Sequence, residues 1–122
     1  LEQTVNYVKE RNAFGKPIAT FQNTQFTLAG LDAEITSARV FVDKCLELHV
    51  QKKLDTVTAS KAKLLSTELQ GRVIDQCLQL HGGYGYMWEY PVARAFADAR
   101  VQRIYGGTSE IMKLIIARSL FA

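Results

Sequence analysis

The sequence predicts an all-α fold, namely an antiparallel up-and-down four-helix bundle with an extra short helix. Apolar residues recur at intervals of three and four along several segments, which is the period of a helix with one buried face. The only two prolines, Pro17 and Pro91, both lie between these segments. We find no convincing strand pattern. The length of 122 residues, with 48% hydrophobic and 22% charged residues, is typical of one globular domain.

The first two helices are expected over residues 1–12 and 21–52. Gly15 and Pro17 stop the first helix, and Lys52-Lys53 suit the negative C-terminal end of the second. The chain opens inside a helical pattern without a Met, so we expect it to be part of a longer protein. The apolar stripe of the second helix contains Phe26, Ala29, Ile35, Ala38, Val42, Leu46 and His49, widened by Leu28, Leu31 and Phe41.

The remaining helices are expected over residues 56–80, 91–104 and from about 109 onward. Asp55 is a suitable N-cap for the first of these, and Pro91 occupies a first-turn position that tolerates proline. Thr108 or Ser109 can cap the last helix. The apolar faces are wider than four helices need for their own core, so we expect further domains or subunits to pack on them.

Three side chains near the fourth helix have simple structural interpretations. We expect Trp88 to fill a gap between helices. Arg94 and Asp98 are four residues apart, a spacing that favours an ion pair on the helix surface.

Charge and cysteine content restrict the classes of function. The net charge of +3 comes from scattered basic residues, which is not the pattern of a nucleic-acid-binding surface. No stretch approaches the length of a membrane span, and no signal peptide is apparent. Cys45 and Cys77 form no CxxC motif, which favours a reduced intracellular protein. Cys45 and His49 share a helix face, but two ligands do not make a metal site, so no metal is expected.

Three short motifs are candidates for binding or chemistry. Two are glycine-rich connections, 79–86 (QLHGGYGY) and 105–110 (YGGTSE), where free backbone N–H groups can approach a ligand. Each taken alone is more often an ordinary helix stop. The third is 11–18 (RNAFGKPI), followed by Gln22, where Arg11 can bind a phosphate and Phe14 can cover a flat ring. A surface arginine and a buried aromatic plug are the commoner alternative.

In this order and spacing, RxxFGKPI…Q, QLHGGYGYMWEYPVARAFADARV and IYGGTSEIMKLIIAR resemble the C-terminal helical domain of the acyl-CoA dehydrogenases. The resemblance covers essentially all 122 residues, and the residues of these motifs are most similar to those of the long-chain enzymes and related bacterial proteins. It implies an FAD-dependent oxidation of a fatty acyl-CoA to a trans-2-enoyl-CoA, as in fatty acid β-oxidation. It also implies N-terminal helical and middle β domains outside this chain.

The resemblance implies a role for each residue that matches a family motif. Arg11, Phe14, Gln22, Gln79 and Gly83 would contact the FAD of a neighbouring subunit in a homodimer or homotetramer. Thr108 and Glu110 would contact the FAD of their own subunit, although many relatives have Gln in place of Glu110. Electrons would pass to an electron-transfer flavoprotein or an equivalent acceptor, in the bacterial cytoplasm or the mitochondrial matrix.

The turn at Tyr105 and Gly106 is where the resemblance places the substrate. Many relatives have the catalytic glutamate at the position of Gly106, which has no side chain. We therefore expect the Gly106 N–H to donate to the thioester carbonyl, and a glutamate upstream of this chain to act as the base. Two alternatives remain: a non-catalytic helical oligomerisation module, and a flavin oxidase or nitroalkane oxidase on the same scaffold.

Overall fold

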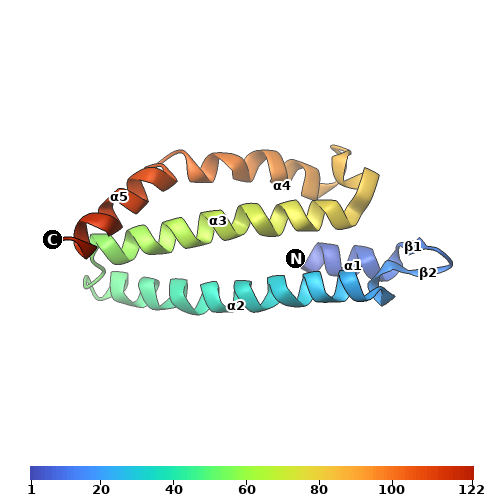
Figure 1. Ribbon diagram of the computed structural model, residues 1–122, viewed down its shortest axis with the longest axis horizontal. Coiled ribbons are helices and arrows are strands. Elements are labelled where there is room, and N and C mark those ends of the chain that lie inside the picture. Colours follow the sequence, from blue (N-terminus) through green and yellow to red (C-terminus); the bar gives the residue numbers. More distant parts are fainter.

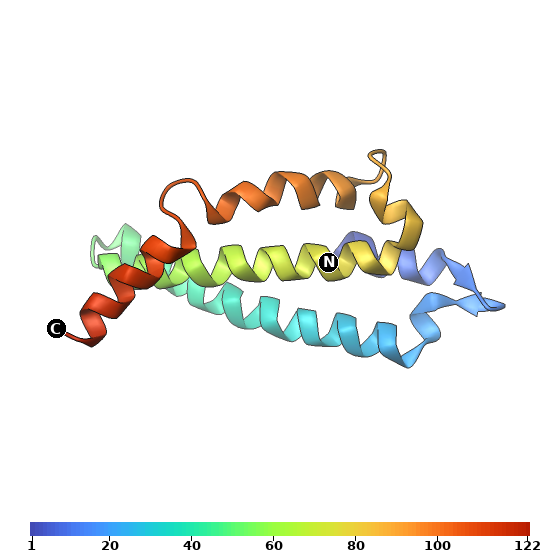
Figure 2. The ribbon, with the colours of Figure 1, turned by 45° about the horizontal axis from the view of Figure 1, so that its top comes forward.

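The computed structural model describes all 122 residues and confirms an all-α up-and-down bundle. Its α-helices are α1 (Glu2–Glu10), α2 (Gln22–Val50), α3 (Thr56–His81), α4 (Pro91–Ala99) and α5 (Ser109–Leu120). The long helices α2 and α3 lie antiparallel, and α1 lies beside them near the start of α2 (Figure 1). Helices α4 and α5 return along α3, so that the fourth element of the bundle consists of two helices in succession (Figures 1 and 2).

The helix ends follow the signals in the sequence. The carboxylate of Asp55 accepts the N–H of Thr58 at 2.8 Å and its hydroxyl at 2.7 Å, which is the expected N-cap of α3. These contacts, the hydroxyl first, hold the pKa of Asp55 below its ordinary value. Gly82 ends α3 with a φ of 58°, which glycine adopts at little cost. Pro91 stands in the first turn of α4.

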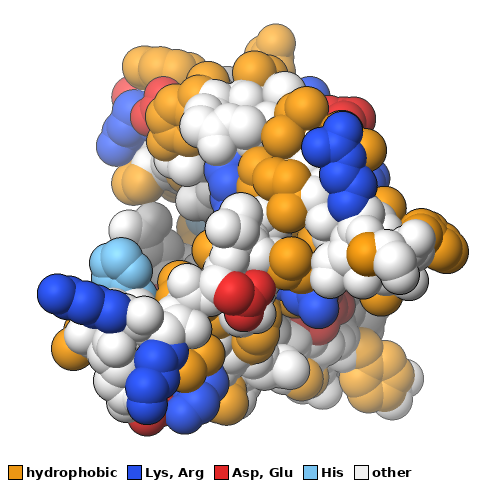
Figure 3. Space-filling view, turned by 90° about the vertical axis from the view of Figure 1, so that its left-hand side faces the viewer, with side chains coloured by type: hydrophobic (Ala, Val, Ile, Leu, Met, Phe, Trp, Pro, Cys, Tyr) orange, Lys and Arg blue, Asp and Glu red, His pale blue; other side chains and the backbone are white.

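The core is small for a chain of this length. Only 14 of the 122 residues are buried, and the apolar cluster that joins α2, α3 and α4 consists of Leu31, Cys77 and Val92. Large apolar side chains are instead open to solvent, including Phe26 and Leu46 from the predicted stripe of α2. Figure 3 shows hydrophobic side chains scattered over the end of the molecule where the C-terminus lies. The chain therefore exposes more apolar surface than its own helices can cover.

One hairpin and two side chains depart from the sequence-based expectations. A short antiparallel hairpin pairs β1 (Asn12–Ala13) with β2 (Lys16–Pro17) where no strand was expected. Trp88 does not fill a gap between helices, because 62% of its surface is exposed. Arg94 does not pair with Asp98, because its guanidinium donates to the main-chain carbonyls of Trp88 at 2.6 Å and Glu89 at 3.0 Å.

Three short 3₁₀ helices complete the chain: η1 (Ile18–Thr20), η2 (Gly82–Tyr86) and η3 (Arg100–Arg103). The predicted helix over residues 91–104 is thus an α-helix only as far as Ala99 and tightens into η3 after it. None of the helices combines the length and the apolar character that crossing a membrane requires.

Candidate functional site

A cleft of about 560 Å³ brings together three of the predicted cofactor-binding residues. Arg11 reaches it from the end of α1, Gln79 from the last turns of α3, and Gly83 from η2. The Arg11 guanidinium carbon lies 5.4 Å from the centre of the Tyr84 ring, so the ring face supports the cation at the mouth of the cleft. Residues 68 positions apart along the chain therefore share one site.

The wall of this cleft is a rigid aromatic cluster. The ring of Tyr7 stacks on that of His81 with the centroids 4.1 Å apart, and the Tyr7 hydroxyl donates to the His81 carbonyl at 3.2 Å. Burial raises the pKa of Tyr7, and Arg11 opposes that shift. The Nδ1 atom of His81 lies 2.8 Å from the Cys77 carbonyl, so Nδ1 carries the proton. These contacts fix α1 against the end of α3 and thereby position Arg11.

Gly83 has space around it that its own chain does not use. A Cβ atom built on Gly83 meets nothing within 4 Å, and its φ is not in the left-handed region. Neither packing nor backbone conformation within this chain therefore requires glycine there. The open space at Gly83 lets a ligand approach the main chain, and the Arg11 cation and the Gln79 amide can donate to the phosphates of a dinucleotide, so these residues fit FAD.

The hairpin between α1 and α2 presents Phe14 to solvent. Phe14 has a φ of 53° and Gly15 a φ of 80°, so the two central residues of the turn are both left-handed. A bulky residue rarely adopts this conformation, and 94% of the Phe14 surface is exposed. Its ring lies edge-on to that of Phe21, with the centroids 6.1 Å apart. Gln22 begins α2 close by, is exposed, and does not line the cleft of Arg11.

The second candidate site is the turn between η3 and α5. Gly106 has a φ of 62° and Gly107 a φ of 102°, so both residues of the turn take the left-handed conformation that favours glycine. The hydrogen bonds of the main chain and side chains do not use the Gly106 N–H. A Cβ atom on Gly106 would also meet nothing within 4 Å, and 53% of Tyr105 is exposed. The turn thus presents a free amide beside open space.

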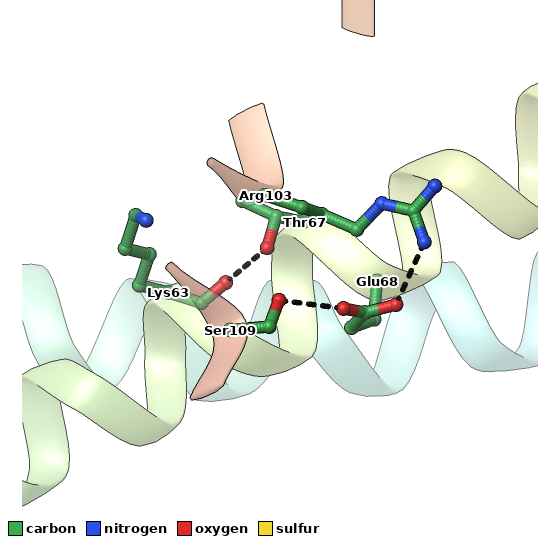
Figure 4. A network of polar contacts seen from close by, with 5 residues as sticks. All are labelled: Lys63, Thr67, Glu68, Arg103 and Ser109. Atoms are coloured by element: carbon green, nitrogen blue, oxygen red, sulfur yellow. Dashed lines mark hydrogen bonds and ion pairs between the residues drawn. The ribbon is translucent and has the colours of Figure 1, made fainter. Parts of the chain in front are cut away.

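Contacts from α3, which the sequence analysis missed, hold this turn. The Lys63 ammonium donates to the carbonyl of Tyr105 at 2.9 Å and also to that of Gly107. Five residues along α3, the Glu68 carboxylate accepts the Ser109 hydroxyl at 2.6 Å and the Arg103 guanidinium at 3.1 Å (Figure 4). These two donors, Ser109 first, hold the pKa of Glu68 below its ordinary value.

Thr108 and Glu110 stand at the start of α5, next to the glycine turn. The Thr108 hydroxyl accepts the N–H of Ile111 at 3.3 Å and so caps the helix, which decides between the two predicted capping residues. Glu110 is exposed. Its own N–H, and after it the Thr108 hydroxyl, hold the pKa of its carboxyl below the ordinary value.

The two candidate sites lie far apart on this chain. Lys63, which touches the turn, and Gln79, which lines the cleft, are separated on α3 by about 24 Å at 1.5 Å per residue. Arg11 and Gly106 therefore cannot surround one compact ligand within a single copy of the chain. No three His, Cys, Asp or Glu side chains gather as a metal site would require.

Comparison with known proteins agrees with the motifs. The family model described as "Acyl-CoA dehydrogenase, C-terminal domain" matches residues 1–121. The chain is 58% identical, over 98% of its length and 28% of the relative's, to the mitochondrial long-chain specific acyl-CoA dehydrogenase of Rattus norvegicus. An acyl-CoA dehydrogenase structure from Geobacillus kaustophilus is 48% identical with a TM-score of 0.96, covering 99% of this chain and 32% of that one.

A glutaryl-CoA dehydrogenase from Mycobacterium smegmatis, solved in complex with FADH₂, is 27% identical with a TM-score of 0.94 and covers 98% of this chain and 31% of that one. The chain thus spans about a third or less of the length of these relatives. The match over nearly every residue and the shared fold lead to one conclusion: this chain belongs to the acyl-CoA dehydrogenase family and corresponds to its C-terminal domain.

Proposed function

We propose that the protein containing this domain is an FAD-dependent dehydrogenase that converts a fatty acyl-CoA to the trans-2-enoyl-CoA. The observation that carries the proposal is the free Gly106 amide beside open space, in the turn where family resemblance places the thioester. The identity to a relative named as long-chain specific supports a long acyl chain as the substrate.

The Gly106 N–H polarises the thioester carbonyl in this proposal. Removal of the α-proton places negative charge on the carbonyl oxygen, and a donor already aimed at that oxygen lowers the barrier. Gly106 has no side chain to accept the proton, so the base is a carboxylate outside residues 1–122. Tyr105 lines the substrate side of the turn, and the missing side chain at residue 106 leaves room for acyl chain.

The domain also holds FAD, which accepts the hydride from the β-carbon. Arg11, Gln79 and Gly83 bind the pyrophosphate and adenosine part of one FAD, with Phe14 and Gln22 beside it. Thr108 and Glu110 contact a second FAD. The separation of about 24 Å between the two sites supports this division, because each FAD then contacts two copies of the domain.

A homodimer or homotetramer follows from this sharing of FAD between subunits. Exposed apolar side chains on α2 and at the C-terminal end, such as Val50 and Phe121, supply surface for such contacts. The partner that would take the electrons from the proposed enzyme is an electron-transfer flavoprotein or an equivalent acceptor. The two buried free cysteines are compatible with the reducing interior of a bacterial or mitochondrial compartment.

The test uses the full-length protein with FAD and acyl-CoA substrates of short, medium and long chain length. We expect bound flavin to be bleached on mixing and trans-2-enoyl-CoA to appear when an electron acceptor is supplied. Hydrogen peroxide as the main product in air, without an acceptor, would indicate the oxidase alternative. Failure to retain flavin and to form product at every chain length would refute the proposal in favour of an oligomerisation module.

A further inference from the structure

Lys63 makes an unusual contact beneath the glycine turn. Its half-buried side chain leaves α3, and its ammonium donates to the carbonyl oxygens of Tyr105, at 2.9 Å, and of Gly107. Figure 4 shows Lys63 on α3 near Glu68, which secures the first residue of α5. No carboxylate forms an ion pair with Lys63, so its charge acts on these two main-chain oxygens.

One of these oxygens belongs to the same peptide unit as the proposed oxyanion donor. The Tyr105 carbonyl and the Gly106 N–H are the two ends of one planar group. The chain contains no cis peptide, so the two bonds point in opposite directions. With the carbonyl held toward α3, the Gly106 N–H points away from α3, into the open space where it has no partner within the chain.

We propose that Lys63 is a positioning residue that orients and polarises this peptide unit. The ammonium draws electron density toward the Tyr105 oxygen, and a hydrogen bond at one end of an amide strengthens the bond donated at the other. The Gly106 N–H is therefore a stronger donor to the thioester oxygen. The second bond, to Gly107, holds the two left-handed glycines in place. This inference rests on the proposed function, because it assigns Lys63 to the same reaction.

The effect of Lys63 belongs mainly to the transition state. Negative charge on the thioester oxygen grows as the α-proton leaves, so a stronger donor gains most at that point. Loss of a whole oxyanion donor lowers kcat by about 10²- to 10³-fold, and loss of its polarisation alone is a smaller effect. We therefore expect Lys63→Gln to lower kcat by about 10-fold, with little change in KM.

The test compares Lys63→Gln, Lys63→Arg and the control Lys61→Gln in the full-length protein. Lys61 is exposed on the same helix, and its side chain makes no hydrogen bond or ion pair. Besides kcat and KM, infrared spectroscopy reads the carbonyl stretch of a bound acyl-CoA labelled with carbon-13 at the thioester. The probe lacks hydrogen on its β-carbon and cannot be oxidised. A polarised carbonyl absorbs at lower frequency than the same thioester in water.

We expect the frequency of the thioester carbonyl stretch to be lower than in water in the wild type and in Lys61→Gln. In Lys63→Gln the frequency should return part of the way toward its value in water. Lys63→Arg should give an intermediate frequency. If Lys63→Gln has the same carbonyl frequency and the same kcat as the wild type, the inference is overturned and the proposed function stays intact. If Lys63→Gln does not fold, the wild type alone is measured. A carbonyl frequency in the wild type that is no lower than in water would then overturn the inference. A wild type that oxidises no acyl-CoA refutes the proposed function, and the inference fails with it.

Discussion

Glu68 offers the sharpest test of how α3 holds the start of α5. Its carboxylate accepts a hydrogen bond from the buried Ser109 hydroxyl and another from Arg103. Replacing Glu68 with alanine removes both contacts and leaves the Ser109 hydroxyl without its acceptor. We expect the first turns of α5, and with them the glycine turn, to open more often.

The size of this effect follows from exposure. A hydrogen bond to a charged group contributes about 1.5–3 kcal/mol, whereas a surface ion pair contributes about 0.2–1 kcal/mol. The Glu68 side chain is 35% exposed, so the lower ends of these ranges apply. The free energy of local opening should fall by about 2 kcal/mol, which corresponds to amide exchange that is about 30-fold faster.

Hydrogen–deuterium exchange with mass spectrometry on the full-length protein measures this opening directly. Glu34→Ala is the matched control, because Glu34 also pairs with an arginine across the α2–α3 contact but its side chain is 50% exposed. We expect Glu34→Ala to leave exchange in α5 unchanged. Equal exchange over residues 108–114 in the two variants would refute the reasoning.

Acidification should reproduce the loss of Glu68. Its pKa is lower in the folded protein than the ordinary value of 4.5, because the folded state favours the charged carboxylate. This contribution to stability is fully present above the ordinary pKa and is lost as the pH falls through the lowered value. The difference in amide exchange of α5 between the wild type and Glu68→Ala should therefore become smaller as the pH falls through the lowered pKa. A difference that stays constant with pH would contradict the role of the charged Glu68 carboxylate.

Three further predictions follow from the cleft and the glycines. Arg11→Ala should reduce both bound-flavin absorbance and oligomer mass, whereas Lys9→Ala on the same helix should change neither. Gly85→Ala should lower unfolding stability by about 1–3 kcal/mol, because its Cβ would overlap the main-chain oxygen of Leu78 in α3. Gly30→Ala, in open space within α2, should instead be neutral or stabilising in the same denaturation experiment. Gly106→Glu should fold at a cost of about 1–2 kcal/mol for the left-handed backbone, and it should shorten the preferred acyl chain in a chain-length profile; an unchanged profile would count against the substrate assignment.

The helices could be predicted because their signals are local. Asp55, Pro91 and Gly82 mark ends of α3 and α4 through backbone conformation and nearby hydrogen bonds, which act within one turn of helix. The hairpin at Phe14 escaped prediction because Phe-Gly is not a usual turn pair, and the left-handed Phe14 breaks the normal preference. Trp88 was misjudged because composition cannot show that no neighbour covers it.

The candidate cofactor residues were assigned through the resemblance of short motifs to a family, yet their grouping in space was not visible in the sequence. Arg11 and Gln79 line one cleft because α1 packs on α3, where Tyr7 stacks on His81. The positions of Arg11, Gln79 and Gly83 in one cleft therefore depend on helix packing. Their contacts with FAD remain a prediction.

The sequence by itself determined where the helices lie, which turns are rich in glycine, and which family the motifs resemble. Each of these depends on residues within a few positions of one another. Only the tertiary structure decided that Lys63 holds the carbonyls around Gly106 and that Glu68 secures Ser109, contacts that span more than 40 residues. Such contacts depend on how two helices pack and leave no periodic pattern along the chain, so a lysine on α3 looks like any other surface lysine until α5 is in place.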